Sequence, residues 1–333
     1  MKKTMIAASV AALALCSSAF ADVSVGAWGR SGLNAVIDTD DISASYLEAT
    51  PDWASGSRVG VNFGASNPEN TIGFKLNLDS NGGTVGVGDQ AKIYGSLFDC
   101  ITVQFGKIQL DTLRGSIGDW GNRTSFSVAG EDTLFTRFNP SKGATVSFDS
   151  NGLFIGAAID SSVTVDSGSS SKLGDIFAAT QAGIGYTIND LMQIKAQYIG
   201  DATSDSWGTV EAGVDLLMIP QNVVETGVKV VLADKVGVQG TVGLSGHVDS
   251  LSYIAHVTDS YSTSNYFGFD AGAEYDFGPC AMGVTGGFSY DTEAKFGVES
   301  YAKKAYSNGY LFGGAAYSTS KGVYLPVGIE FFF

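Results

Sequence analysis

Four basic side chains occur where alternating strands would direct them to a polar face. Lys75, for example, stands between the apolar residues Phe74 and Leu76. Successive side chains of a strand point to opposite faces of the sheet. By this parity four residues share one face and would form a basic wall: Arg30, Arg58, Lys75 and Lys92. The alternative is four solvated charges that merely avoid an apolar environment.

The long polar segment 110–142 carries charges of both signs. Its acidic candidates are Asp111, Asp119, Glu131 and Asp132, and its basic residues are Arg114, Arg123 and Arg137. Acidic side chains that face a basic wall would set up a transverse electric field, and the charges that line a pore sort the ions that cross it. The alternative is that these are ordinary exposed loop charges.

Residues for covalent chemistry or cofactor binding are scarce. Ser252 and His256 share a face of a predicted strand, but four residues of strand separate them by about 13 Å. That distance is too long for a nucleophile and its base. The sequence contains no Walker loop, dinucleotide-binding fingerprint or paired-cysteine zinc spacing. We therefore expect no enzyme activity, no cofactor and no metal site.

The elements that would position these charges have a repeat of two residues. Apolar and polar side chains alternate in 71–79, 192–198, 210–216, 236–245 and 267–275. Each such strand has one apolar and one polar face. The runs are about ten residues long, whereas strands of soluble sandwiches are often nearer five or six. The pattern therefore favours a membrane barrel over a soluble β-sandwich.

Composition and the N-terminal segment narrow the class of protein. The chain has 333 residues and a net charge of −15, with 34 acidic and 19 basic side chains. This charge argues against nucleic-acid binding, because phosphate contacts need clustered Lys and Arg. Residues 1–21 combine a basic start, an apolar stretch and Ala19-Phe20-Ala21, which is typical of a cleaved signal peptide. The barrel domain would then comprise residues 22–333.

The membrane-crossing elements are expected to be strands. A transmembrane helix needs about twenty predominantly apolar residues, and the mature chain has no such run. Antiparallel barrels instead cross with tilted strands that face lipid and lumen alternately. Short turns would join some strands, and longer polar loops the others, at 38–55, 110–142, 161–175, 200–207, 258–265 and 291–305. The sequence predicts an all-β transmembrane antiparallel β-barrel with short periplasmic turns and long extracellular loops.

The sequence allows either sixteen or eighteen strands. About seventeen segments resemble strands, whereas a single-chain bacterial barrel has an even number. The length of the mature chain favours sixteen strands. Eighteen is the alternative, if residues 295–301 form a further strand.

The C-terminal residues resemble a known assembly signal. One face of the predicted last strand carries Leu325, Val327, Ile329, Phe331 and Phe333. A last strand that ends in Phe is similar to the signal that Gram-negative outer-membrane barrels present to the barrel assembly machinery. This resemblance implies that role for Phe331 and Phe333.

Residues 22–160 resemble the general porin family. Residues 57–64 and 70–78 are similar to its second and third strands, and 90–107 to its next hairpin, which closes on Gly106-Lys107. A long segment follows where the family folds its third loop into the lumen. The chain departs from the family inside this loop, because Ile-Gly-Asp-Trp-Gly at 117–121 replaces the family's Pro-Glu-Phe-Gly stretch.

The resemblance implies a function and partners. General porins are water-filled outer-membrane channels for passive diffusion of small hydrophilic solutes and ions, they form homotrimers, and a basic cluster lines their constriction. We therefore expect outer-membrane lipid and small solutes as partners. The alternative is a non-conducting outer-membrane barrel that acts as a surface adhesin or structural protein, with bulky side chains in its lumen.

Overall fold

The computed structural model describes residues 22–38, 41–49, 57–81, 84–114, 140, 142–161, 173–201, 206–261, 265–319 and 322–333. Most of these residues form strands. The strands are β1 (Asp22–Ile37), β2 (Tyr46–Ala49), β3 (Ser57–Ser66), β4 (Ile72–Asn81), β5 (Thr84–Leu97), β6 (Ile101–Lys107), β7 (Gly143–Ser150), β8 (Leu153–Asp160), β9 (Thr180–Ile188), β10 (Met192–Gly200), β11 (Ser206–Leu216), β12 (Asn222–Ala233), β13 (Gly237–Val248), β14 (Leu251–Tyr261), β15 (Asn265–Asp276), β16 (Ala281–Tyr290), β17 (Ala294–Tyr306), β18 (Gly309–Ser318) and β19 (Gly322–Phe332). The helices are η2 (Ile42–Ala44) and α2 (Leu173–Ala178).

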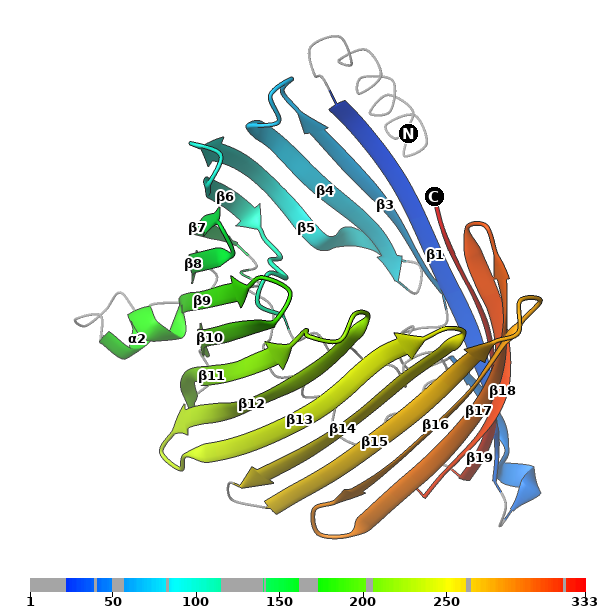
Figure 1. Ribbon diagram of the computed structural model, residues 1–333. Coiled ribbons are helices and arrows are strands. Elements are labelled where there is room, and N and C mark those ends of the chain that lie inside the picture. The colour runs from blue at the N-terminus through cyan, green and yellow to red at the C-terminus, as the bar shows by residue number, and fades with distance from the viewer. Residues whose placement is uncertain are drawn as a thin grey trace.

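Neighbouring strands pair antiparallel, and the sheet closes on itself. β1 pairs with β19 over a register that runs from Trp28 opposite Phe332 to Ile37 opposite Val323. Figure 1 shows the strands following one another around a ring, from the blue β1 to the red β19 beside it. Closure leaves the sheet without a free edge. The predicted antiparallel β-barrel is confirmed.

Within the part of the chain that the structure describes, the ring contains eighteen strands, because β2 and β3 share one place in it. β3 pairs with residues 22–31 of β1, and β2 pairs with residues 33–36. Both lie on the edge of β1 that faces away from β19. Eighteen is the alternative count that the sequence left open, rather than the favoured sixteen.

Strand β17 lies in the region that the sequence left open. The predicted long loop at 291–305 is wrong, since β17 already begins at Ala294. Charged side chains gave this stretch the composition of a loop, but the inward ones are paired: Lys303 Nζ lies 2.6 Å from Glu274 Oε1. Phe296 and Val298, on the other face of the strand, are exposed. β17 therefore has the alternating inward and outward side chains of a barrel strand, although its composition is rich in charged residues.

The two faces of the barrel have opposite chemistry. Exposed apolar side chains cover the outside, among them Val25, Ile72, Ile194, Val238 and Phe269. Buried polar side chains line the inside, among them Gln104, Thr145, Lys195, Glu211 and Thr258. The period-two faces predicted from the sequence are confirmed. Among the described residues, no helix is long and apolar enough to cross a membrane.

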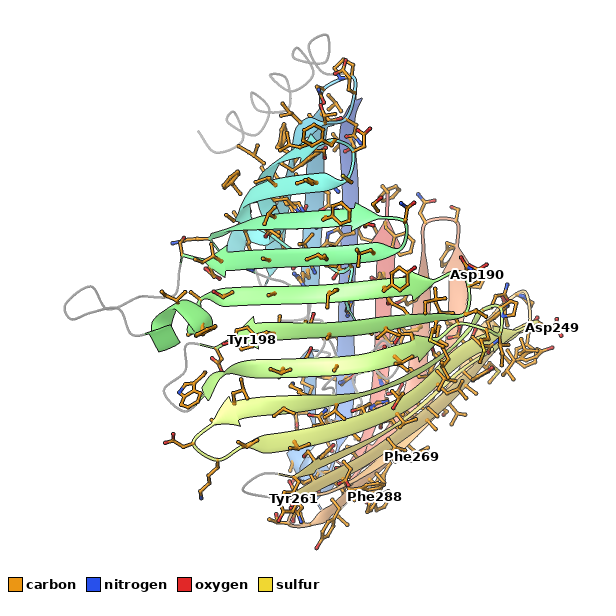
Figure 2. All side chains as sticks on the ribbon, turned by 60° about the vertical axis from the view of Figure 1, so that its left-hand side comes forward. Asp190, Tyr198, Asp249, Tyr261, Phe269 and Phe288 are labelled. Carbon is orange, nitrogen blue, oxygen red and sulfur yellow. The ribbon has the colours of Figure 1, made fainter. Side chains whose placement is uncertain are left out.

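The two rims of the barrel differ in their connections. One rim carries tight turns whose residues adopt positive φ, such as Asn151 (51°) followed by Gly152 (80°), and Asp249 (51°). Asn, Asp and Gly tolerate this conformation best, so they are the residues that such hairpins select. Figure 2 places Asp190 and Asp249 at this rim and Tyr198 and Tyr261 at the opposite one. On the opposite rim, the predicted loops 38–55 and 161–175 contain η2 with β2, and α2.

Candidate functional site

Arg30 and Arg58 lie opposite each other on β1 and β3, and Trp28 lies beside both. Their Cα atoms are partners in the sheet register. Their guanidinium carbons lie 5.7 and 5.1 Å from the centre of the Trp28 ring. Cations at this distance from an aromatic face are attracted by its quadrupole. A Cβ atom at Gly60 would overlap the indole, so the glycine lets Trp28 lie against the wall.

The charge of Arg58 is balanced by a carboxylate on the next strand. Arg58 Nε donates to Asp79 Oδ2 at 2.8 Å, and Nη2 contacts the same oxygen. The two side chains are only 24% and 11% exposed, so solvent screens the pair weakly. Arg58 therefore adds little net positive charge to the lumen.

Lys75 and Lys92 lie opposite each other on β4 and β5 and line a cavity in the lumen wall. Its volume is about 350 Å³, and it is lined by Asn70, Lys75, Lys92, Tyr94, Ser96, Thr102, Gln104 and Leu110. Leu110 belongs to the segment after β6, and the adjacent Asp111 attracts Lys92 electrostatically. One predicted acidic residue thus lies near one predicted basic residue.

The segment after β6 turns into the barrel. Leu113 is buried against Phe154 and Ala158, and Leu110 and Ile199 pack around them. Phe154, Ala158 and Ile199 belong to the inward faces of β8 and β10, since their strand neighbours Ile155 and Ile159 are exposed outside. The start of the predicted constriction loop therefore packs on the inner wall.

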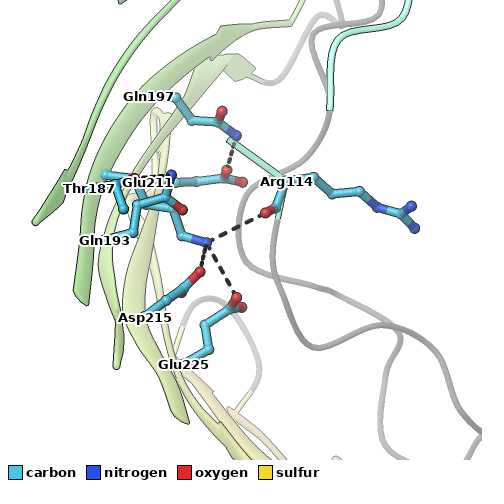
Figure 3. Close-up of polar contacts among 8 residues, drawn as sticks. Arg114, Thr187, Gln193, Gln197, Glu211, Asp215 and Glu225 are labelled. Atoms are coloured by element: carbon cyan, nitrogen blue, oxygen red, sulfur yellow. Dashed lines mark hydrogen bonds and ion pairs between the residues drawn. The ribbon is translucent and has the colours of Figure 1, made fainter. Parts of the chain in front are cut away.

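A buried charge cluster receives the same segment. Lys195 Nζ lies 2.8 Å from Asp215 Oδ2 and 3.4 Å from Glu225 Oε2, and all three side chains are at most 3% exposed. The ammonium also lies 3.5 Å from the carbonyl oxygen of Arg114. Figure 3 shows the two carboxylates converging on one point, while the guanidinium of Arg114 is directed away from them. The cluster thus contacts the backbone at residue 114 and leaves its side chain pointing elsewhere.

The sequence did not predict this cluster, although its alternation correctly assigned the inward and outward faces of β10 and β11. The parity of β10 and β11 turns Lys195, Gln197, Glu211 and Asp215 inward. What parity does not supply is the register, which sets Asp215 directly opposite Glu225 and places Gln197 Nε2 2.5 Å from Glu211 Oε2. An inward lysine on one strand and an unusual concentration of inward acids on the next two was the available signal.

Several predicted residues lie outside the described part of the chain. Of the segment 110–142, the structure describes 110–114, 140 and 142. Asp111 and Arg114 are therefore placed, as given above. The positions outside the described residues are Asp119, Arg123, Glu131, Asp132 and Arg137.

The two C-terminal phenylalanines lie at the seam of the barrel. Phe333 and Ala27 exchange two backbone hydrogen bonds, of 2.6 and 3.0 Å. The ring of Phe331 covers Gly29 on β1 and lies 5.7 Å from the ring of Phe333. Both residues therefore contribute to the contact between the first and last strands.

Fixed charges are distributed along the described part of the lumen. Within the described residues, no group of three or more His, Cys, Asp or Glu side chains has the geometry to hold a metal ion. The arrangement offers a set of fixed charges, with a basic region on β1 to β5 and a mixed one on β10 to β12, where three inward acids outnumber two inward lysines. Fixed charges of this kind discriminate among ions by electrostatics.

Known proteins resemble this chain in fold rather than in sequence. No protein-family model matches it, and no curated protein matches it either. A mutant of the Rh. blastica porin covers 94% of this chain and 100% of its own, with a TM-score of 0.54 and 14% identity. Another mutant of that porin has a TM-score of 0.53 and 16% identity over the same shares. A chain described under "Asymmetric conductivity of engineered proteins" gives 0.54 and 14%. The chain therefore has the porin-type β-barrel fold.

Proposed function

We propose that this chain is a general porin of the outer membrane, a water-filled channel for passive diffusion of small hydrophilic solutes and ions. The observation that carries the proposal is the closed ring of strands with apolar side chains outside and polar, charged side chains inside. An apolar outer band suits lipid, and a polar interior suits water. The porin-type fold supports the same conclusion.

The ion-sorting part of the channel is proposed to be the basic wall and the loop after β6. Arg30, Arg58, Lys75 and Lys92 would line one side of the passage. Asp111 and Arg114 stand where the loop enters the lumen, next to Lys92 and to Lys195. The rest of the constriction would come from the remaining charged residues of the loop, Asp119, Arg123, Glu131, Asp132 and Arg137.

The cellular setting follows from the same proposal. Residues 1–21 would be removed as a signal peptide, and residues 22–333 would insert into the outer membrane with the tight turns on the periplasmic side. The barrel assembly machinery would recognise Phe331 and Phe333. By family resemblance, three copies of the chain would form a homotrimer.

The test is single-channel conductance of the refolded protein in a planar lipid bilayer. We expect stepwise ohmic openings, in groups of three for a homotrimer. The reversal potential across a salt gradient then reports whether cations or anions pass preferentially. A protein that migrates as a heat-modifiable barrel but gives no conductance would instead support the surface adhesin or structural barrel.

A further inference from the structure

Two lysines stand side by side on adjacent strands of the lumen wall. Lys75 and Lys92 are Cα partners in the β4–β5 register. Directly opposite side chains have Cβ atoms about 5 Å apart, and like charges in such a pair destabilise the sheet. Both side chains lie on the lumen face, since Phe74 and Ile93 occupy the opposite face of these strands. Their repulsion calls for a compensating negative charge.

The positive charge of the neighbouring Arg58 is balanced by a direct ion pair, whereas the charges of these two lysines are balanced less completely. Asp79 forms a direct ion pair with Arg58. Across the described residues, neither Lys75 nor Lys92 forms a hydrogen bond or ion pair with a side chain. Asp111 acts on Lys92 only through its longer-range attraction. One carboxylate near two ammonium groups leaves a net positive charge.

The space beside the lysines is shaped and lined for a small polar ligand. The cavity of about 350 Å³ is lined by residues of β4, β5 and β6 and, from the segment after β6, by Leu110. The amide of Gln104 lines the cavity, and so do the hydroxyls of Ser96 and Thr102, which lie 3.4 Å apart and share one hydrogen bond, so that one of their two protons remains for a ligand. The Tyr94 hydroxyl also lines the cavity, but it donates to Asn70 Oδ1 at 3.1 Å. Amide and hydroxyl protons that are not already engaged donate hydrogen bonds to an oxyanion. Charge and hydrogen-bond donors therefore converge on one volume.

We propose that this cavity is an oxyanion-binding site, in which Lys75 and Lys92 together hold a small dianion that carries a phosphate group or two carboxylates. Two ammonium groups provide two charge-assisted hydrogen bonds, which are shorter and stronger than neutral ones. The proposal rests on the proposed channel, because it names a class of solute that would pause there during passage. It also divides the basic wall by role: Arg58 is neutralised by Asp79, and the lysine pair binds.

Asp111 sets the strength of the site. Asp111 belongs to the segment after β6, and its negative charge acts on Lys92, so it competes electrostatically with an incoming anion. A site with this counter-charge binds weakly and releases readily, as a channel requires, since conduction needs sites that solutes can leave. Removal of the carboxylate should therefore strengthen binding.

Anion binding is measured directly by isothermal titration calorimetry of the folded full-length mature barrel in a neutral detergent at pH 7.5. Inorganic phosphate and succinate are titrated separately, so that the tighter of the two identifies the preferred oxyanion group. For the preferred anion we expect the double variant Lys75→Gln with Lys92→Gln to bind at least about tenfold more weakly, since each lost charged hydrogen bond is worth roughly one decade. Asp111→Asn should bind more tightly than the unmodified protein.

The matched control is Lys229→Gln on β12. Lys229 shares the inward face of Glu225 but lies on a strand that does not line the cavity. Lys229→Gln removes one positive charge from the lumen, as Lys75→Gln does, so a loss of binding equal to that of the single variant Lys75→Gln would overturn a localised site. Unchanged binding in the double variant would overturn it as well. Should the double variant fail to fold, Lys75→Gln and Asp111→Asn, with opposite expected effects, decide the question.

The bilayer recordings separate this inference from the proposed function. Conductance without binding of either anion would overturn the oxyanion site and support the channel. Binding without conductance would support the site and overturn the channel.

Discussion

At the scale of single residues, the buried charges of β10 to β12 depend closely on one another. Asp215 and Glu225 lie directly opposite each other, an arrangement that is repulsive without a cation between them. Lys195 supplies that cation within 2.8 and 3.4 Å. Because desolvated charges are costly, a buried pair depends strongly on each partner. Lys195 therefore links three strands, β10, β11 and β12, to the start of the loop.

The first prediction at this scale concerns Lys195→Met. The substitution leaves two buried carboxylates without their cation, and we expect the free energy of unfolding to fall by about 3–5 kcal/mol. Urea unfolding of the barrel in lipid vesicles measures the change. The triple variant Lys195→Met, Asp215→Asn and Glu225→Gln removes the whole charge cluster and should recover most of the loss. Equal destabilisation in both variants would contradict the argument.

At the scale of elements, the amino-acid composition of β17 suggests a loop, and a bulge obscures the alternation of β5, although the pairing shows that both are strands. β17 has the composition of a loop, yet Lys295, Lys303 and Glu299 occupy inward positions, while Phe296 and Val298 face outward. β5 begins at Thr84, earlier than the predicted start at 90, because residues 88–90 lie opposite the single residue Asn77. Such a bulge interrupts the pairing and hides the first half of the strand from a search for alternation.

The turn between β16 and β17 is held by one carboxylate. Asp291 accepts a backbone hydrogen bond from Thr292 and another, at 3.2 Å, from Glu293, and Lys295 Nζ lies 3.4 Å away. The hydrogen bond from Thr292, followed by that from Glu293 and the charge of Lys295, lowers the pKa of Asp291 from 3.8 to about 2. Hydrogen bonds to the charged form of a carboxyl group favour that form.

The corresponding prediction is a pH dependence confined to this turn. A lowered pKa in the folded state gives stability that is fully present above the ordinary value of 3.8 and is lost as the pH falls toward 2. Amide hydrogen exchange at Thr292 and Glu293 should therefore accelerate across this interval, relative to other turns. Asp291→Asn keeps an acceptor oxygen but cannot titrate, so it should abolish the dependence. An Asp291 titration midpoint at or above 3.8 would contradict the prediction.

At the scale of the whole molecule, the pairing of β1 with β19 closes the sheet into a barrel. The outward aromatic rings of Phe331 and Phe333 pack on each other at this seam, and Phe331 covers Gly29. Replacement of both by Ala should lower the free energy of unfolding by at least about 1 kcal/mol, which is the value of a ring pair beyond the apolar area that it buries. The temperature at which the heat-modifiable barrel unfolds on a gel measures the effect. Phe332→Ala, which leaves the outward pair intact, is the control and should shift that temperature less.

The sequence alone determined the architecture and the faces. Alternation with a period of two, the run length and the terminal phenylalanines predicted an antiparallel barrel, and they turned Arg58, Lys75, Lys92 and Lys195 inward. These features are local, because successive side chains of a strand point to opposite sides wherever the strand lies. The strand at 57–64 was predicted from the family resemblance instead, and the strand at 70–78 from both, and they correspond to β3 and β4 of the barrel.

The partners of each charge were decided only by the tertiary structure. A shift of one residue between strands would turn the faces over, but a shift of two keeps every face and changes every partner. Parity therefore placed Arg58, Lys75 and Lys195 on the lumen side without distinguishing their surroundings. The register gives Arg58 the carboxylate of Asp79, gives Lys195 two carboxylates, and sets Lys75 against another lysine. Those pairings, which arise between distant segments, separate a neutral wall from one that can attract an anion.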